Sequence, residues 1–280
     1  MDTKRISNVI RKEWEVMFKS VNNTLFITLI PLIMIGQLMA FLYFGGGFIS
    51  EDILNELLSQ TIFQHAISNM ESLLPQSQGK LPINEVFQLL ILIQFPYYLL
   101  LIPTMVAISF ATFNILEEKQ TGTLEPLLAT PVRTWELLFG KALAGAIPSI
   151  IISWFYTGLC VIAISILMPF KTVSFYLVRE PFISIWLITL LLMVPAISIL
   201  SFMLGVISSS KASDAKSAQN ISLFIILPVL AIIGTQITGL VIFTRGLLLL
   251  LTLAIGVIDY LVLRLAIKIF QRESILVRWR

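Results

Sequence analysis

Six long apolar runs dominate this sequence and restrict what the chain can fold into. A helix needs about 20 predominantly apolar residues to cross a hydrocarbon core about 30 Å thick. The six runs reach that length, and they cover residues 24–44, 86–116, 137–168, 182–207, 221–243 and 247–267. Apolar residues make up 57% of the chain and charged residues only 12%, whereas a soluble domain carries about 25% charged residues. The sequence therefore predicts an all-α membrane protein with six transmembrane helices.

The length of 280 residues leaves room for one transmembrane domain, 1–280, and for no sizeable water-soluble catalytic domain beside it. At 1.5 Å per residue the run 86–116 would form a helix of about 46 Å, so we expect it to tilt or to project into water. The first run follows a long segment of mixed charge and precedes no small-residue cleavage pattern, so we interpret it as a retained span. Prolines inside the runs predict kinks whose freed carbonyls are satisfied by neighbouring helices; these are Pro31, Pro96, Pro103, Pro148, Pro195 and Pro228.

The distribution of positive charge predicts the orientation of the spans. Of the 19 Lys and Arg residues, only Lys80, Lys171, Arg179 and Arg245 fall outside the side that holds both termini. Because Lys and Arg concentrate in cytoplasmic loops, both termini are predicted to be cytoplasmic, with a cytoplasmic tail over 268–280, in a multi-pass protein of the cell (plasma) membrane. The formal net charge of +3 is too small to indicate nucleic acid as a partner.

The segment 1–23, ahead of the first span, is predicted to hold an amphipathic helix. Four of its charged residues fall opposite an apolar stripe, namely Arg11, Lys12, Glu15 and Lys19. Such a helix lies in the cytoplasmic interface of a bilayer and contacts membrane lipid. It serves either as an anchor or as a docking surface for a partner. The apolar stripe consists of Ile6, Val9, Ile10, Trp14, Met17, Phe18 and Val21.

The external loop over 45–85 is too long for a simple connection. Its apolar residues recur every three or four positions, so we expect one or two amphipathic helices there. His65 lies among them without a second ligand, and we interpret it as a surface histidine rather than a metal ligand. One cysteine and one histidine cannot form a disulfide framework or a zinc site unaided.

The cytoplasmic loop over 117–136 carries the most informative pattern. Gly122 interrupts the helix that descends from the second run, Thr123 can cap a new helix, and Glu125 suits the positive end of that helix. The result is a short helix over 124–130 at the membrane surface. It contains no nucleophile, base or set of metal ligands, so we interpret it as an element that another protein pushes. The residues assigned to it are Glu117, Glu118, Gly122, Thr123, Leu124, Glu125, Leu127, Leu128 and Pro131.

This loop resembles the coupling-helix signature of a known family, the membrane permeases of type-two ATP-binding-cassette exporters. The resemblance is carried by Glu118, the run 122–125 and the run 127–131. The order of elements along the whole chain is similar to that family as well. The resemblance implies that the chain is the permease subunit of an ATP-driven exporter. It further implies that two permeases pair around a translocation path and that two cytoplasmic ATPase subunits dock on the short helix. It leaves open whether the second permease is another copy or a homologue, and whether the role is export or a mechanical or regulatory one.

The sequence lacks an ATP-binding motif of its own. No G-x-x-x-x-G-K-[ST] phosphate loop occurs, and the nearest string, 139–142, lacks the upstream glycine and the hydroxyl that would hold magnesium. No H-E-x-x-H or G-x-S-x-G motif occurs either. The chain is therefore predicted not to be an enzyme and to bind no cofactor or metal. ATP and magnesium are expected in the partner ATPase.

Few polar residues lie inside the apolar runs, and those that do are candidates for the translocation path. An intramembrane carboxylate such as Asp259 is costly and often functional. The alternative is that Asp259 faces the bundle and pairs with Arg264 or with a hydroxyl of a neighbouring helix. Tyrosines at this depth are equally explained as packed aromatic residues. The candidate path residues are Gln94, Tyr97, Tyr98 and Asp259.

An ion-coupled secondary transporter is the alternative function. That class usually keeps several ionisable residues at the midplane and has internal repeats, whereas this chain has one clear acid and no convincing repeat. The expected substrate is amphipathic or hydrophobic. The sequence does not identify it further, because a path lined by apolar side chains accepts lipids, peptides and drugs alike.

Overall fold

The computed structural model describes residues 3–19, 21–47, 50–61, 64, 67–68, 82–120, 122, 134–167, 182–211, 215–237 and 244–269. Within these residues every regular element is a helix, so the all-α fold class is confirmed. The helices are α1 (Thr3–Lys19), α2 (Val21–Gly47), α3 (Glu51–Ser59), α5 (Ile83–Leu99), α6 (Leu101–Gln120), α8 (Thr134–Leu167), α10 (Phe182–Ile188), the π-helix η1 (Thr189–Met193), α11 (Val194–Lys211), α12 (Ala215–Ile237) and α13 (Arg245–Ile269).

Five stretches of helix are long and apolar enough to cross a membrane. They are Ile27–Phe44, Ile83–Phe113, Trp135–Ile166, Phe182–Ser209 and Arg245–Lys268. The remaining predicted span, 221–243, falls on α12, whose apolar part over Phe224–Gln236 is shorter in the described part of the chain. Residues 238–243 lie outside that part. The structure thus supports five spans, and the sixth stays a prediction.

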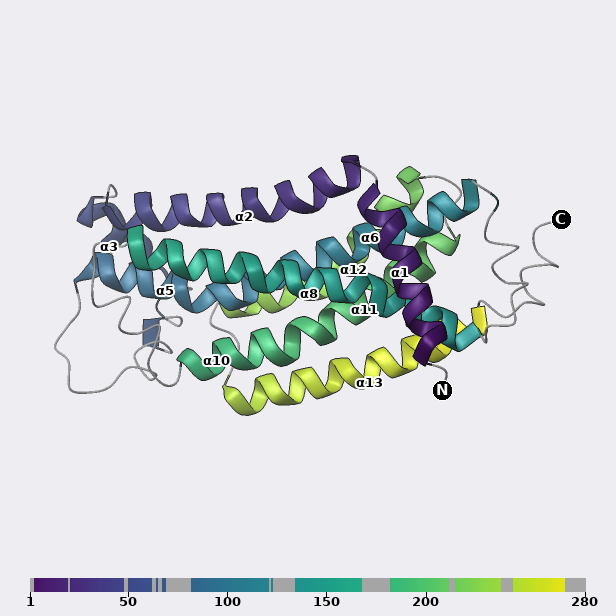
Figure 1. Cartoon of the computed structure of the whole chain (residues 1–280). Coiled ribbons are helices and arrows are strands. Elements are labelled where there is room, and N and C mark those ends of the chain that lie inside the picture. Colours follow the sequence, from purple (N-terminus) through teal and green to yellow (C-terminus); the bar gives the residue numbers. More distant parts are fainter. Residues whose placement is uncertain are drawn as a thin grey trace.

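The long helices run side by side along one axis, as Figure 1 shows. Helix α1 crosses one end of this bundle and packs against α8, α2 and α6. Helix α3 lies at the opposite end, where it packs against α5. Helix α13 runs toward the end that α1 crosses (Figure 1). The first and last described helices therefore share one end of the molecule.

The second predicted span is divided into two helices rather than formed by one. The break lies at Leu100, whose N–H bonds to the carbonyl of Tyr97 at 3.1 Å, in the tighter geometry of a 3₁₀ turn. Pro103 follows, and because it has no N–H it cannot continue the helical hydrogen bonds to the carbonyl of Leu99. The region is still one candidate span, Ile83–Phe113, and the interruption at Leu100 lies between the two prolines for which kinks were predicted. Helix α6 also continues to Gln120, past the end predicted from apolarity alone.

Prolines inside the spans leave carbonyls without their helical donors, and aromatic side chains of other helices fill two of these places. Pro148 in α8 cannot donate to the carbonyl of Ala144, and the indole Nε1–H of Trp14 in α1 donates to that oxygen at 2.8 Å. Tyr156 of α8 also donates a hydrogen bond of 2.8 Å to the carbonyl of Thr28 in α2, although Pro31 removes the helical donor of Ile27 and not that of Thr28. A neighbouring helix thus satisfies the carbonyl that Pro148 leaves without a donor, as expected for a membrane-spanning bundle.

At the π-helix η1, a second carbonyl that lacks its helical donor is satisfied by an aromatic side chain of another helix. The N–H of Val194 bonds to the carbonyl of Thr189, five residues back. In this register the carbonyl of Leu190 would accept from the next residue, but that residue is Pro195. The indole Nε1–H of Trp154 in α8 donates to Leu190 at 2.9 Å instead. Helix α8 therefore holds α2 and η1 through the donors of two of its own aromatic residues.

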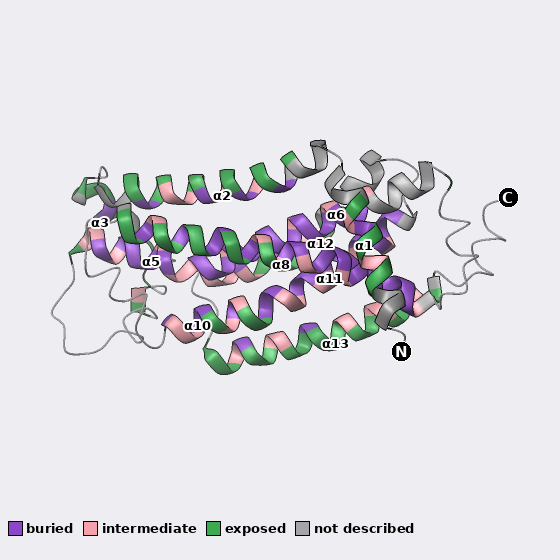
Figure 2. Cartoon of the chain, viewed as in Figure 1, coloured by how far each residue is buried: buried purple, intermediate pink, exposed green. Residues whose placement is uncertain are grey.

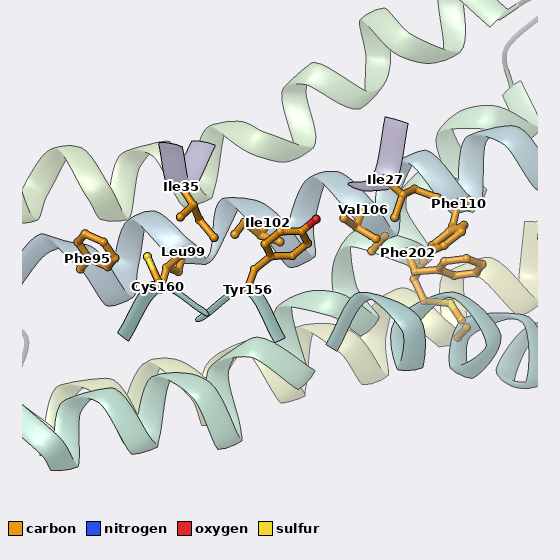
Figure 3. Packing of buried hydrophobic residues seen from close by; sticks show 14 of the residues in the cluster. Ile27, Ile35, Phe95, Leu99, Ile102, Val106, Phe110, Tyr156, Cys160 and Phe202 are labelled. Atoms are coloured by element: carbon orange, nitrogen blue, oxygen red, sulfur yellow. The ribbon is translucent and has the colours of Figure 1, made fainter. Parts of the chain in front are cut away.

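The core of the bundle lies between α6, α8 and α11, and Figure 3 shows part of it, with Phe110 and Phe202 at one end. Two glycines allow the helices to come close. A Cβ added at Gly205 in α11 would lie 2.7 Å from the Cβ of Ala111 in α6, and one at Gly145 in α8 would lie 2.0 Å from the ring of Phe202. Small residues at such contacts are typical of packed membrane helices.

The outer surface of the bundle is largely apolar. Exposed residues line α2 and α13, at the two flanks of the bundle, and buried residues concentrate in the helices between them (Figure 2). Leu253 on α13 and Ile33 on α2 are 68% and 63% exposed. A soluble protein rarely exposes apolar surface over whole helices, and such faces are typical of a multi-pass membrane protein.

Candidate functional site

The predicted coupling segment connects α6 to α8. Helix α6 ends at Gln120, and Gly122 follows with a φ of +66°, a left-handed conformation that glycine adopts without strain. Gly122 therefore interrupts the helix as its position predicted. Glu117 and Glu118 belong to the last turn of α6 by their backbone, and their side chains lie outside the described residues. So do the other members of this site, Thr123, Leu124, Glu125, Leu127, Leu128 and Pro131.

Helix α8 begins at Thr134, directly after this segment, and Glu136 in its first turn suits the positive end of the helix dipole. Both α6 and α8 contact α1. The segment 123–133 is thus tied at each side to a membrane-spanning helix that touches α1.

Helix α1 is amphipathic, as its sequence predicts. Arg11 and Glu15 lie on its exposed face and form an ion pair at 3.1 Å, with side chains 83% and 69% exposed. Trp14 lies on the opposite face and donates the hydrogen bond to Ala144 described above. The side chains of Met17 and Phe18 lie outside the described residues.

A buried ion pair joins α1 to α8, and the sequence analysis missed it. The ammonium of Lys141 lies 3.0 Å from a carboxylate oxygen of Glu13, and both side chains are 3% exposed. Two features of the sequence could have indicated this ion pair. Glu13 falls on the apolar stripe of α1, between Ile10 and Met17, and Lys141 falls inside an apolar run. Buried charges in membrane proteins pair with one another, so an isolated acid and an isolated base in such places indicate each other.

The candidate path residues lie on two different spans. Gln94 in α5 donates its amide to the carbonyl of Gln236 in α12 at 3.2 Å. Tyr97 is 1% exposed and belongs to the packed core, whereas Tyr98 is half-buried at its edge. The interpretation of Tyr97 as a packed aromatic residue is thus the one that its surroundings favour.

Asp259 in α13 does not pair with Arg264. The guanidinium of Arg264 lies over the ring of Tyr260, 4.7 Å from its centre. One carboxylate oxygen of Asp259 is buried and has no hydrogen-bond partner within the described residues. The same holds for the side-chain carbonyl oxygens of Gln94 and Gln236. These atoms are acceptors for which the described part of the chain supplies no donor.

The described residues define a multi-pass, all-helical membrane protein with several apolar helices long enough to cross a bilayer. The sequence pattern of the family described as ABC-2 family transporter protein matches residues 7–244. The chain therefore belongs to this family of membrane permeases of ATP-binding-cassette transporters, and this membership implies partnership with an ATP-binding-cassette ATPase. A search of curated proteins and a search of solved structures each found no match.

Proposed function

We propose that this chain is the permease subunit of an ATP-driven exporter and moves an amphipathic or hydrophobic substrate. Two permeases, either two copies of this chain or this chain and a homologue, form the translocation path, and separate ATPase subunits drive it. The family match over residues 7–244 carries the proposal. The absence of a phosphate loop from the sequence agrees with it, because ATP must then be bound by another chain.

In this proposal the segment 123–133 receives the motion of the ATPase. The short helix over 124–130 seats in a groove of the ATPase, and α6 and α8 carry the motion into the membrane. The direct attachment of both helices to this segment supports the assignment. Gln94, Tyr98 and Asp259 are the residues we assign to the path, since they offer polar atoms within otherwise apolar spans.

The proposed topology has six spans, with the sixth formed by α12, and both termini in the cytoplasm of a plasma-membrane protein. Helix α1 and the end of α13 share one end of the bundle (Figure 1), and a chain that starts and finishes at one end makes an even number of crossings. The concentration of Lys and Arg on that side supports its cytoplasmic placement.

The division of labour between subunits leads to a first prediction. The purified chain alone should show no saturable ATP binding by equilibrium dialysis and no ATP hydrolysis. The complex that it forms with its ATPase should hydrolyse ATP. A matched sample in which the phosphate-loop lysine of the ATPase is replaced should lose that activity. Saturable binding of ATP to the chain alone would contradict the proposed function.

The topology leads to a second prediction, which single cysteines test after Cys160→Ala removes the native thiol. Cysteines introduced at Lys80 and Lys171 should react with a membrane-impermeant maleimide added outside intact cells. Cysteines at Lys119 and Lys211 should react only after the cells are opened. External labelling at 119 would disprove the six-span arrangement, and labelling of all four positions in opened cells is the control for reactivity.

A further inference from the structure

Two polar contacts fasten α1 to one short stretch of α8. The Glu13–Lys141 ion pair and the hydrogen bond from Trp14 to Ala144 involve adjacent residues on α1 and neighbouring turns on α8. The two charged side chains are each 3% exposed. The exposed pair Arg11–Glu15 on the other face of α1 provides a contrast within the same helix. An exposed pair of that kind contributes little to stability.

A buried ion pair makes the contact between the two helices selective. It adds little net stability compared with apolar side chains, but removal of one partner leaves a buried charge uncompensated. The carbonyl of Ala144 has a similar requirement, because Pro148 has taken away its helical donor. The ammonium of Lys141 and the carbonyl of Ala144 are therefore both paired only when α1 lies in one position and one register along α8. Partial separation of the helices would leave a charge and a carbonyl unpaired at once.

We infer that Glu13 and Lys141 are positioning residues that lock α1 onto the first turns of α8, so that α1 moves with α8 during the transport cycle. The second part rests on the proposed function, since α8 begins directly behind the segment to which we assign ATPase docking. In this arrangement α1 is not a passive anchor in the interface. It belongs to the unit that the ATPase moves.

Hydrogen exchange of the full chain in lipid nanodiscs tests the docking itself, without any ATPase. In the wild type, the amides of α1 should be protected. Glu13→Lys should accelerate their exchange at least about tenfold, because two buried cations then face each other. The double variant Glu13→Lys with Lys141→Glu should restore protection to within about twofold. Glu15→Gln, a matched change on the exposed face, should leave exchange unchanged.

Two results would overturn the docking part: α1 equally protected in Glu13→Lys and wild type, or no recovery in the double variant. If Glu13→Lys does not accumulate in the membrane, Glu13→Gln removes the charge without placing two cations together. It should then accelerate exchange of α1 relative to Glu15→Gln, and equal exchange in these two variants would count against the inference.

The effect on the transport cycle needs the complex with its ATPase in vesicles, with a fluorescent phospholipid analogue as the transported probe. Glu13→Lys should raise the ATP consumed per probe molecule moved at least about fivefold, and the double variant should lower it again. A loss of folded protein alone would reduce both rates in proportion and leave this ratio unchanged. Faster exchange in α1 with an unchanged ratio would refute the role in transport while leaving the proposed function intact. Absence of ATP-driven movement in the wild type would instead refute the proposed function, and the exchange result would still decide the docking.

Discussion

Gly205→Leu should lower the thermal unfolding midpoint of the detergent-solubilised protein by at least about 6 °C. The Cβ alone would lie 2.7 Å from the Cβ of Ala111 and 3.5 Å from the Cα of Ile108, so α6 and α11 would have to separate. Overpacking of this kind costs about 3 kcal/mol where backbone cannot yield. Size-exclusion chromatography of heated samples measures the midpoint as the temperature at which half of the monodisperse protein is lost.

A glycine on the outer face of the bundle supplies the control for this prediction. A Cβ added at Gly256 in α13 meets nothing within 4 Å. Gly256→Leu should therefore leave the midpoint within about 2 °C of the wild type, since surface substitutions rarely change stability by more than about 0.5 kcal/mol. Equal midpoints for the two variants would mean that α6 and α11 do not pack as closely as the structure places them.

Leu127→Ala, Leu128→Ala and Glu125→Lys should each leave the protein inserted and paired but uncouple it from the ATPase. If the two leucines fill a groove on the ATPase, truncation of one costs about 2 kcal/mol, or roughly thirtyfold in docking affinity. Glu125 and Glu118 would make charge-assisted contacts at the rim of that groove. Transport in vesicles that contain both subunits should fall more than ATP hydrolysis by the complex does.

An exposed leucine on α13 serves as the control that distinguishes coupling from membrane anchoring. Leu261 in α13 is 57% exposed on the outer face of the bundle, and Leu261→Ala should leave transport unchanged. If Leu127 and Leu128 only rest on lipid head groups, their substitution should behave in the same way. Unchanged transport in all three variants of the coupling segment would remove the reason to assign ATPase docking to it.

The helices of this protein were predictable because each depends on a local property of the chain. A run of about 20 apolar residues is sufficient to indicate a membrane-spanning helix, and apolar residues at every third or fourth position indicated α1. Local rules also located the end of α6, where Gly122 adopts the left-handed conformation that its position predicted. The division of the second span at Leu100 was not specified, because Pro96 and Pro103 each indicate a kink without saying which one divides the helix.

The contacts between helices could not be predicted in the same way. Pro148 showed that the carbonyl of Ala144 would lose its donor, but nothing in the local pattern assigned Trp14 to it. The π-helical register that leaves the carbonyl of Leu190 for Trp154 was not predicted. Lys141 was counted only as a positive charge that sets orientation, and its partner Glu13 lies far away in the sequence. Such pairs follow from tertiary packing, which single-sequence periodicity does not describe. Residues 123–133, on which the proposed coupling depends most, lie outside the described part of the chain, so their helix remains a prediction.

The contact between α1 and α8 also has a consequence for how the protein is made. Trp14 and Ala144 are 130 residues apart, and a ribosome adding about 5–20 residues per second completes that distance in roughly 6–26 s. During this interval α1 has been synthesised but its acceptor has not, and an amphipathic helix in that condition rests on the membrane surface. The carboxylate of Glu13 stays hydrated until Lys141 enters the bilayer with the third span. The end of the bundle that α1 crosses therefore cannot close until nearly half of the later chain has followed, although α1 is the first helix made.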